Sequence, residues 1–471
     1  MALPVILINA TGGSDTQASG AGPSTALFGS TGVTNGTGLD VDLSADAPDL
    51  SGVATDGSAV LFMSDTNSGS RNFSKITAVD NGTKIVTVSD AFQASNTDAW
   101  AIGGKRASIG STTSRKLAEK GGSTAGDAMP GWTIRFESGH TESLTSQLLW
   151  RRAGNTTDGP IVVEGVAGAA TMPVFSYNQN SAMFLVASNY VHMKNFAGKN
   201  TNGTKSASYL VSFQAANHGV ISNLKVVDAT DVPWSGIGIT STSVDNAVIG
   251  CEIRNCSGHG INMPGGHVVI RNTYIRDCGV GITKSGSTPL VITDTIIYSC
   301  TSHGIVLGAG PTNLAVTFID RTAIYENGGD GINVAIANLG NYQNLHISNN
   351  IIAKNGGYGV NFNGQTAPAL NAASTLVYNN CTGTGGTANT SGAYDVDVSV
   401  DNQAVDPQFT DPASDNFTIG ANLANLGFPT ANIGNVASGT RSYVDIGAAQ
   451  RQATGGGGGG IRLAGHGGLA A

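Results

Sequence analysis

The sequence predicts an all-β fold, a right-handed parallel β-helix, from three observations. A Gly-x-Gly-aliphatic unit, or its Ser-x-Gly variant, recurs six times between about residues 236 and 360, and successive copies lie 22, 21, 23, 27 and 28 residues apart. Segments of alternating aliphatic residues such as VIRNTYIRDC precede the copies, which indicates strands with one buried face. A period of this length, made of short strands and turns, is typical of one coil of a solenoid.

Helical repeats have similar periods, but these coils are rich in Gly, Thr, Asn, Ile and Val, which disfavour helix and suit strands and turns. Stacked coils place equivalent residues one above another. We therefore expect an inward aliphatic ladder made of Ile261, Ile282, Ile305, Ile332 and Val360. A second expected ladder consists of Cys256, Cys278, Cys300, Asn327 and Asn355. Its thiols are interpreted as small packed hydrophobes, without redox or metal chemistry.

The composition excludes several classes of protein. Hydrophobic residues make up 40% of the 471 residues and the net charge is −8, which excludes a disordered chain. The 66 glycines follow no three-residue period, so the chain is not a collagen. Without a basic block we expect no nucleic-acid partner. Five cysteines without a CxxC pair predict neither a disulfide framework nor a metal site, and no cofactor is expected.

The start of the chain predicts neither membrane insertion nor export. Its longest clean apolar run, Leu3 to Ile8, is far shorter than a membrane span, and no basic region precedes it. We therefore expect a soluble chain that is not exported by the secretory route.

Changes in composition and sequence pattern divide the chain into four expected parts. Residues 1–125 form a small β domain that includes PVILIN, AVLFMS, KITAVD, KIVTVSD and DAWAIGG, with a hairpin at Asn81-Gly82 and a short helical link at 114–120. Residues 126–394 form the β-helix, with about ten coils. Residues 395–452 form a cap over the last coil, and residues 453–471 are a Gly-rich linker and terminal peptide.

Two longer coils indicate a contact surface. The extra residues fall at the same phase of the coil, at 307–313 and 335–343, so these insertions should lie on one face. Loops on a rigid scaffold often carry binding. The residues that we expect there to contact carbohydrate or a partner are Asn313, Asn338 and Tyr342.

Catalytic residues are harder to find. His259, in Gly258-His259-Gly260, fills the variable position of the repeat, which favours a coil residue over a catalytic one. Asp228 and Asp231 lie beside Trp234, an arrangement that suits a sugar site, although an Asx turn explains the same residues. Glu326 is a further carboxylate candidate, beside a turn. Arg254 and Arg276 share one column and are interpreted as a solvated outer stripe. No catalytic residue is assigned.

Two segments resemble known families. The coils, together with the cap pattern DPQF-x-DP-x-x-DNFTI and the closing DIGAAQ, resemble the right-handed parallel β-helix proteins of the pectate-lyase-like superfamily. That scaffold hosts lyases, hydrolases, adhesins and phage tailspikes, so the resemblance implies a fold and no single activity. The opening, with INATGGSDTQASGAGPSTAL and AWAIGGKRA, resembles the N-terminal segments of β-helix proteins encoded by tailed phages.

The phage resemblance implies a structural protein of the virion, assembled in the host cytoplasm. Such a protein would be a tailspike, a fibre or a capsid decoration, commonly a homotrimer, with other virion proteins and host surface glycan as its partners. The polygalacturonase-like hydrolases of this fold use Gly-His-Gly together with Asn-Thr-Asp, an Asp pair and Arg-Ile-Lys. Here Asn-Thr-Asp occurs at Asn96–Asp98, in the expected N-terminal β domain and outside the coils, and the Asp pair and Arg-Ile-Lys do not occur. Two alternatives remain open: a tailspike that cleaves polysaccharide as a hydrolase or lyase, and a non-catalytic bacterial adhesin that binds carbohydrate.

Overall fold

A computed structural model covers the chain and describes most of the barrel and coil residues. The described residues are 5–8, 27–45, 47, 49–56, 58–63, 73–92, 97–102, 109, 119–120, 130–145, 147–151, 153–177, 181–200, 209–226, 235–240, 242–286, 288–308, 316–335, 345–361, 375–378, 390–391, 399–400, 407 and 409–417. The chain divides into two compact units. The first comprises Met1–Asn202 and Leu210–Leu224, and the second Gly203–Tyr209 and Lys225–Ala471. Among the described residues, none belongs to a helix long and apolar enough to cross a membrane.

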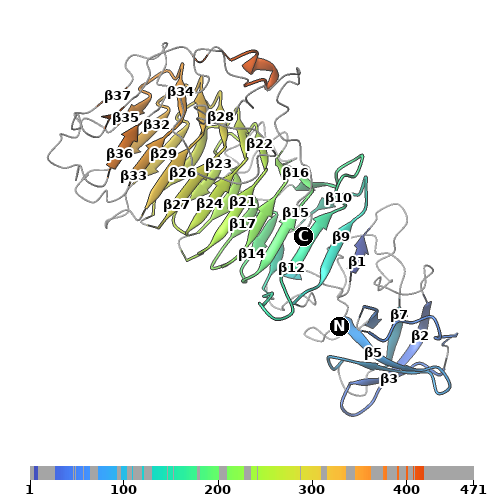
Figure 1. The fold of residues 1–471 in the computed structure, drawn as a ribbon. Coiled ribbons are helices and arrows are strands. Elements are labelled where there is room, and N and C mark those ends of the chain that lie inside the picture. The colour runs from blue at the N-terminus through green and yellow to red at the C-terminus, as the bar shows by residue number, and fades with distance from the viewer. Residues whose placement is uncertain are drawn as a thin grey trace, which may run out of the picture. The chain divides into compact units, whose positions relative to one another are not determined.

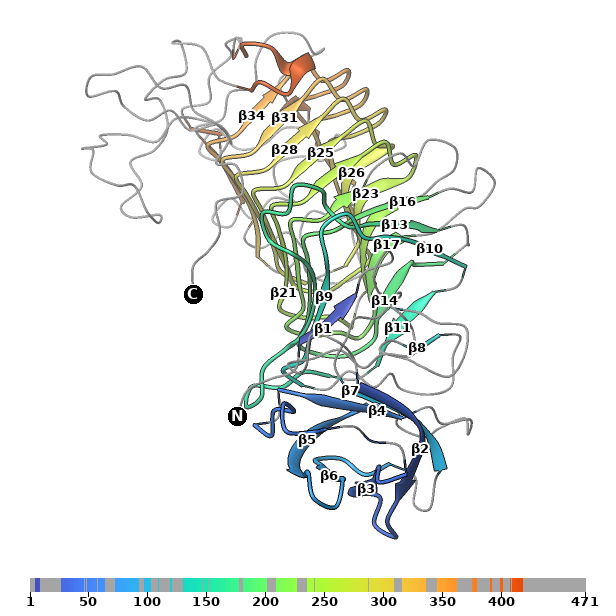
Figure 2. The same cartoon turned by 90° about the vertical axis from the view of Figure 1, so that its right-hand side faces the viewer.

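The first unit contains a closed antiparallel β-barrel (Figure 2). Its strands, in barrel order, are β2 (Leu27–Thr34), β3 (Asp40–Asp42), β6 (Ile85–Val88), β5 (Phe73–Asp80), β4 (Val60–Met63) and β7 (Thr97–Ile102). Alternating side chains point inward and surround the fully buried Trp100. The hairpin expected at Asn81-Gly82 is confirmed as the β5–β6 pair. Because Asp80 pairs with Ile85, its turn has four residues rather than two.

The first unit also contains coils built from three parallel sheets. Sheet 1 holds β1 (Val5–Ile8), β9 (Thr133–Phe136), β12 (Ile161–Gly165), β15 (Val191–Lys194) and β18 (Val220–Ser222). Sheet 2 holds β10 (Thr141–Leu144), β13 (Val174–Tyr177) and β16 (Ala197–Asn200). Sheet 3 holds β8 (Glu119–Lys120), β11 (Leu148–Trp150), β14 (Phe184–Val186) and β17 (Tyr209–Phe213). Phenylalanines fill the interior, where the rings of Phe175 and Phe184 pack edge to face.

Two sequence expectations about this unit are corrected. PVILIN was expected in the N-terminal β domain, but β1 pairs in parallel with β9 and so begins sheet 1. A helical link was expected at 114–120, but Glu119–Lys120 forms strand β8, which pairs antiparallel with β11. In both cases a distant partner strand decides the conformation, because such short segments carry only a local preference.

The second unit is also built of coils with three parallel sheets (Figure 1). Sheet 1 holds β21 (Asn246–Ile249), β24 (Val268–Arg271), β27 (Leu290–Thr293), β30 (Thr317–Asp320), β33 (Leu345–Ser348), β36 (Thr375–Tyr378) and β38 (Ser399–Val400). Sheet 2 holds β19 (Lys225–Val226), β22 (Glu252–Arg254), β25 (Tyr274–Arg276), β28 (Ile296–Tyr298), β31 (Ala323–Tyr325) and β34 (Ile351–Ala353). Sheet 3 holds β20 (Ser235–Ile239), β23 (His259–Met263), β26 (Val280–Lys284), β29 (Ile305–Gly308), β32 (Ile332–Ala335), β35 (Val360–Asn361) and β37 (Thr390–Ser391).

Both predicted ladders are confirmed. The aliphatic ladder is in register across sheet 3, from Ile261 opposite Ile282 to Ile332 opposite Val360. The three thiols of the other ladder are buried and free of disulfides. The hydrogen bond with Cys256, together with burial, raises the pKa of the Cys278 thiol well above its usual value. Such a thiol stays protonated and is a poor nucleophile, as expected for packing.

The asparagines continue this ladder with amide hydrogen bonds from coil to coil. The Cys300 backbone N–H donates to Asn327 Oδ1 at 3.0 Å, and Asn327 Nδ2 donates to Asn355 Oδ1 at 2.9 Å. These bonds satisfy polar groups that the buried turn between sheets 2 and 3 would otherwise leave unpaired.

The glycines of the repeat mark close approaches between coils. A Cβ atom added at Gly281 would lie 2.4 Å from the Gly304 carbonyl oxygen and 2.4 Å from Ile297 Cγ2. We therefore expect Gly281→Ala to destabilise the second unit by about 1–3 kcal/mol, measured by urea denaturation. Gly36→Ala, where nothing lies within 4 Å of the added atom, is the control and should change stability little. Equal effects of the two substitutions would contradict the close approach.

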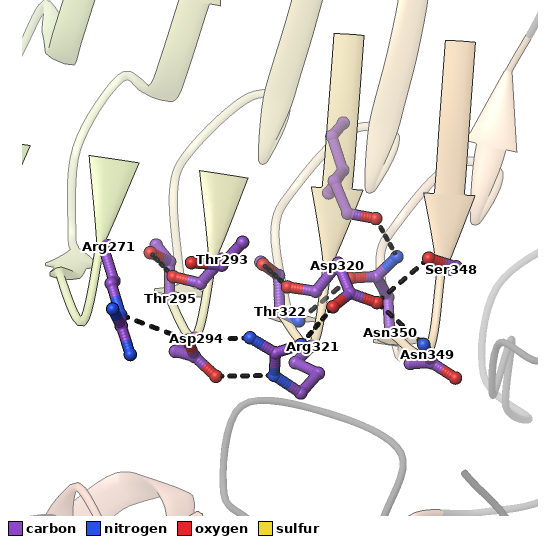
Figure 3. Close-up of polar contacts among 11 residues, drawn as sticks. Arg271, Thr293, Asp294, Thr295, Asp320, Arg321, Thr322, Ser348, Asn349 and Asn350 are labelled. Carbon is purple, nitrogen blue, oxygen red and sulfur yellow. Dashed lines mark hydrogen bonds and ion pairs between the residues drawn. The ribbon is translucent and has the colours of Figure 1, made fainter. Parts of the chain in front are cut away.

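A buried charge ladder lies at the turns between sheets 1 and 2 of the second unit (Figure 3). Arg321 forms two bonds with Asp294, Nε to Oδ1 at 2.8 Å and Nη2 to Oδ2 at 3.0 Å, and also contacts Asp320. Asp320 Oδ1 accepts from Ser348 and Asn349 at 2.9 and 2.7 Å. Burial lowers the pKa of Arg321, but bonds and charges from the two aspartates outweigh it and raise the pKa overall. The side chain is thus held as a buried cation that ties neighbouring coils together.

Candidate functional site

Of the candidate catalytic and contact residues, Glu326 lies where the structure describes its surroundings. It follows β31 in the turn from sheet 2 to sheet 3 and is exposed. The others lie outside the described residues: Asp228, Asp231, Trp234, Asn313, Asn338 and Tyr342. The two insertions at 307–313 and 335–343 also lie mostly outside the described residues, so the contact face expected from them stays a prediction.

His259, the variable residue of the second repeat copy, lies half-buried in β23. It bonds through Nδ1 to the Thr283 hydroxyl of the next coil at 2.8 Å, and burial lowers the pKa of His259. In the first copy the variable residue, Ile237, is instead fully buried opposite Ile261.

Asp330 is an organised structural carboxylate. Its Oδ1 accepts from the Tyr358 backbone N–H at 2.8 Å, and its Oδ2 accepts from Asn333 and Asn361 at 2.6 and 2.9 Å. The Asp330 backbone N–H donates to His303 Nδ1 at 2.9 Å. Asp330 therefore links three neighbouring coils, its own and the next through the carboxylate and the preceding one through its backbone N–H.

A segment from the predicted cap packs against the outer face of sheet 2. Residues 409–417, called here the strap, include the short helix η4 (Pro412–Ser414) and lie beside β25, β28 and β31 (Figure 2). Phe417 is buried there, with its ring centroid 5.4 Å from that of Tyr298 and 6.1 Å from that of Tyr274. The cap was expected to cover the last coil, whereas this part of it covers the side of several coils.

Asp415 of the strap contacts Arg254 and Arg276, the two arginines that were expected to be solvated. Its Oδ2 accepts from Arg254 Nη2 at 3.1 Å, and its Oδ1 bonds to the Tyr274 hydroxyl and lies 3.6 Å from Arg276 Nη1. The side chains of Arg254 and Arg276 keep only 27% and 23% of their exposure. The solvated-stripe interpretation was therefore wrong, because a segment far along the chain covers the column.

An open cavity of about 360 Å³ lies between the strap and the ends of β28 and β31. Its walls carry aromatic rings, both signs of charge and one proline, namely Tyr298, Tyr325, Glu326, Lys354, Phe409, Asp411, Pro412 and Ala413. Tyr325 is framed by Phe409, at 4.9 Å between ring centroids, and by Lys354 Nζ, at 5.3 Å from the ring centroid. The cavity thus joins apolar faces to exposed charges.

The electrostatics of the cavity keep the tyrosines neutral. Burial, the charge of Glu326 and the 3.3 Å bond from Tyr298 Oη to Glu326 Oε2 raise the pKa of Tyr298. Burial and the bond to Asp415 raise the pKa of Tyr274 further. Both hydroxyls therefore remain hydrogen-bond donors at neutral pH. No group of His, Cys, Asp and Glu suited to holding a metal ion is found among the described residues.

Backbone geometry positions the two charged ends of the cavity. Glu326 and Lys354 occupy the same turn position in successive coils, with φ of 51° and 54°, in the left-handed region. Both side chains line the cavity. Sequence reasoning found Glu326 from its charge but missed Lys354, Phe409 and Asp411. For Lys354 the available signal was the turn position that it shares with Glu326, and for Phe409 and Asp411 it was the cap pattern.

A family model confirms the fold. The model described as "Right handed beta helix region" matches residues 209–382. With the strand order above, the chain is an all-β protein whose coils form a right-handed parallel β-helix. No curated protein matches the chain significantly.

Solved structures that resemble the chain are distant. The crystal structure of pectate lyase Pel9A has 17% identity and a TM-score of 0.49, covering 69% of this chain and 89% of that one. The A-module of the mannuronan C-5 epimerase AlgE4 from Azotobacter vinelandii has 15% identity and a TM-score of 0.40, covering 58% and 87%. An alginate lyase from Paenibacillus sp. str. FPU-7 has 14% identity and a TM-score of 0.36, covering 59% and 90%. At these identities the likeness concerns the fold alone.

Proposed function

We propose that this chain is a surface β-helix protein of a tailed-phage virion that contacts host glycan. The observation that carries the glycan contact is the cavity under the strap, where aromatic rings lie beside Glu326, Lys354 and Asp411. Sugars stack their apolar faces on aromatic rings, and their hydroxyls bond to carboxylates and ammonium groups. The virion assignment rests on the resemblance of the opening segment to phage β-helix proteins.

In this proposal the parts of the chain have separate roles. The N-terminal barrel attaches the chain to the particle or packs beside it, and the coils present the glycan site on a rigid stack. Oligomerisation, most simply as a homotrimer, gives several sites per particle and so raises avidity.

A second candidate function is cleavage of the glycan. It is favoured by Glu326 and Asp411, two carboxylates that line the same cavity. Glycoside hydrolysis uses a pair of carboxyl groups, one as an acid and one as a base or nucleophile. In a cleaving enzyme, Glu326 and Asp411 would take these two roles.

Glycan binding is tested with host capsule and lipopolysaccharide glycans on the full chain. We expect Glu326→Gln to weaken binding at least about tenfold, because it removes a charged hydrogen-bond acceptor from the cavity. Asp245→Asn is the control, since Asp245 also stands in a left-handed turn position, is exposed and does not line the cavity. If no glycan binds, or if both variants behave alike, the cavity is not the contact site.

Reducing-end release separates the two candidate functions. Cleavage predicts release that falls by about a hundredfold or more in Glu326→Gln, whereas binding alone predicts no release. The virion location is tested by finding the chain at fixed stoichiometry in purified particles. Its absence from particles would refute that part of the proposal.

A further inference from the structure

The strap places the Asp415 carboxylate and the Phe417 ring against the outer face of sheet 2, which carries partners for both. Asp415 and Phe417 are two residues apart, and sheet 2 offers Arg254 and Arg276 to the first and three tyrosines to the second. The strap is thus a segment of the same chain that covers this face: Asp415 pairs with the arginines, and Phe417 packs on the tyrosines beside them.

The two arginines require an anion between them. Arg254 and Arg276 are paired in register on neighbouring strands, so their charges lie about one strand spacing, roughly 4.8 Å, apart at the backbone. The Glu252 carboxylate forms ion pairs with both Arg254 and Lys225. Asp277 lies 3.6 Å from Arg276 Nε. Without Asp415, this group has three cations and two carboxylates, so one positive charge is unmatched.

The arginines also retain unused donor capacity. Among the described residues, the buried Nε atoms of Arg254 and Arg276 have no hydrogen-bond partner, because the 3.6 Å between Arg276 Nε and Asp277 is longer than a hydrogen bond. The Asp415 carboxylate lies between the two arginines and leaves both Nε donors unsatisfied. An unsatisfied buried donor costs free energy. A ligand with a carboxylate and further oxygens around it would satisfy more of them.

The strap reaches this position in a conformation that is sparsely populated for a residue with a side chain. Asp415 has φ of 63° and ψ of 20°, in the left-handed region. That conformation costs about 1–2 kcal/mol for residues other than glycine, and less for aspartate. The contacts of Asp415 and Phe417 therefore hold the strap in place, and a ligand that replaces them would release it.

We propose that the outer face of sheet 2 beneath the strap is a binding site for a carboxylate-bearing saccharide, with Asp415 as the internal competitor for its carboxylate. Arg254, Arg276 and the Tyr274 hydroxyl bind the sugar carboxylate, and the Tyr274 and Tyr298 rings receive the sugar face that Phe417 now covers. This inference rests on the proposed glycan-contacting function and specifies the class of glycan. Neutral sugars lack the group that the arginines need.

The test compares strap and acceptor variants of the full chain with defined sugars. We expect Asp415→Asn, which keeps the hydrogen-bonding shape and tolerates the left-handed turn, to bind a hexuronate or sialic-acid oligosaccharide at least about tenfold more tightly than the wild type, because the competent state is more populated. Arg254→Gln combined with Arg276→Gln should abolish that gain. Ser414→Ala, in the same strap, is the matched control, since the Ser414 side chain is exposed and does not line the cavity, and it should show no gain. Comparing the hexuronate with the sialic-acid oligosaccharide identifies which of the two acidic sugars the site binds more tightly.

A second readout follows the strap itself. Hydrogen exchange of residues 409–417 should speed up when the acidic sugar binds the wild type, and should not change with a neutral oligosaccharide of the same length. Binding that is equal in wild type and Asp415→Asn, or that leaves strap exchange unchanged, would overturn this inference while the proposed glycan contact stands. Failure of every glycan to bind would overturn both.

Discussion

Replacing Arg321 by methionine is expected to destabilise the second unit by about 3–5 kcal/mol, the largest effect of any substitution considered for this chain. The guanidinium is 7% exposed and lies between the carboxylates of Asp294 and Asp320, which are 16% and 5% exposed (Figure 3). Methionine fills a similar volume but leaves two partly desolvated carboxylates without their cation. The cost is therefore mainly the uncompensated buried charge and only secondarily lost packing.

Equilibrium denaturation in urea measures this loss. Arg271→Met is the control, because Arg271 belongs to the same ladder, 3.6 Å from Asp294, yet its side chain is 50% exposed. Exposed ion pairs contribute up to about 1 kcal/mol, so the control should change stability by less than that. A loss below about 1 kcal/mol for Arg321→Met would show that water reaches the buried carboxylates and that the ladder is not essential.

Lys284→Met is expected to act in the opposite direction and to stabilise the second unit. Lys284 lies in an inward column of sheet 3 between Met263 and Leu307 and is 1% exposed. The hydrogen bond that the structure shows for its ammonium group goes to the Thr288 hydroxyl, at 3.4 Å. Burial lowers the pKa of Lys284 to about 8, from 10.5. That difference corresponds to about 3 kcal/mol, which methionine would recover at pH 7.

The pH dependence identifies the cause. The folded chain has the lower pKa, so between about pH 8 and 10.5 the unfolded chain binds more protons and stability rises with pH. Below pH 8 both states are protonated and the full penalty applies. Above 10.5 both are neutral and the penalty disappears. Lys284→Met should remove this rise, so that the two proteins converge in stability at high pH.

A matched control separates burial from loss of charge. Lys84→Met removes a lysine from the barrel whose ammonium bonds to exposed Asn81, and this change should leave the pH profile of the second unit as it was. If Lys284→Met lowers stability at neutral pH, the ammonium must be better solvated inside the coils than its burial indicates, and the expected sign would be wrong.

The repeating part of the chain could be predicted from the sequence alone. The aliphatic ladder from Ile261 to Val360 and the Cys-to-Asn ladder were predicted and are in register. The glycine spacing holds from Gly260 onward, but in the first copy Gly238 pairs with Asn262, so Gly236 takes the position equivalent to Gly260. Each ladder is a local pattern repeated from coil to coil, and stacking converts equal sequence phase into equal position.

The contacts made by segments outside the repeat became known only from the fold. Val5–Ile8 joins sheet 1, and Asp415 and Phe417 cover the arginine column of sheet 2. The sequence marked the cap pattern but not the surface beneath it, because no periodic relation links residue 415 to residue 254. The fold also showed that Lys284 points into the core of the coils, which the sequence did not indicate. Repetition encodes position along a stack, whereas these long-range partners depend on which surface the folded coils leave open.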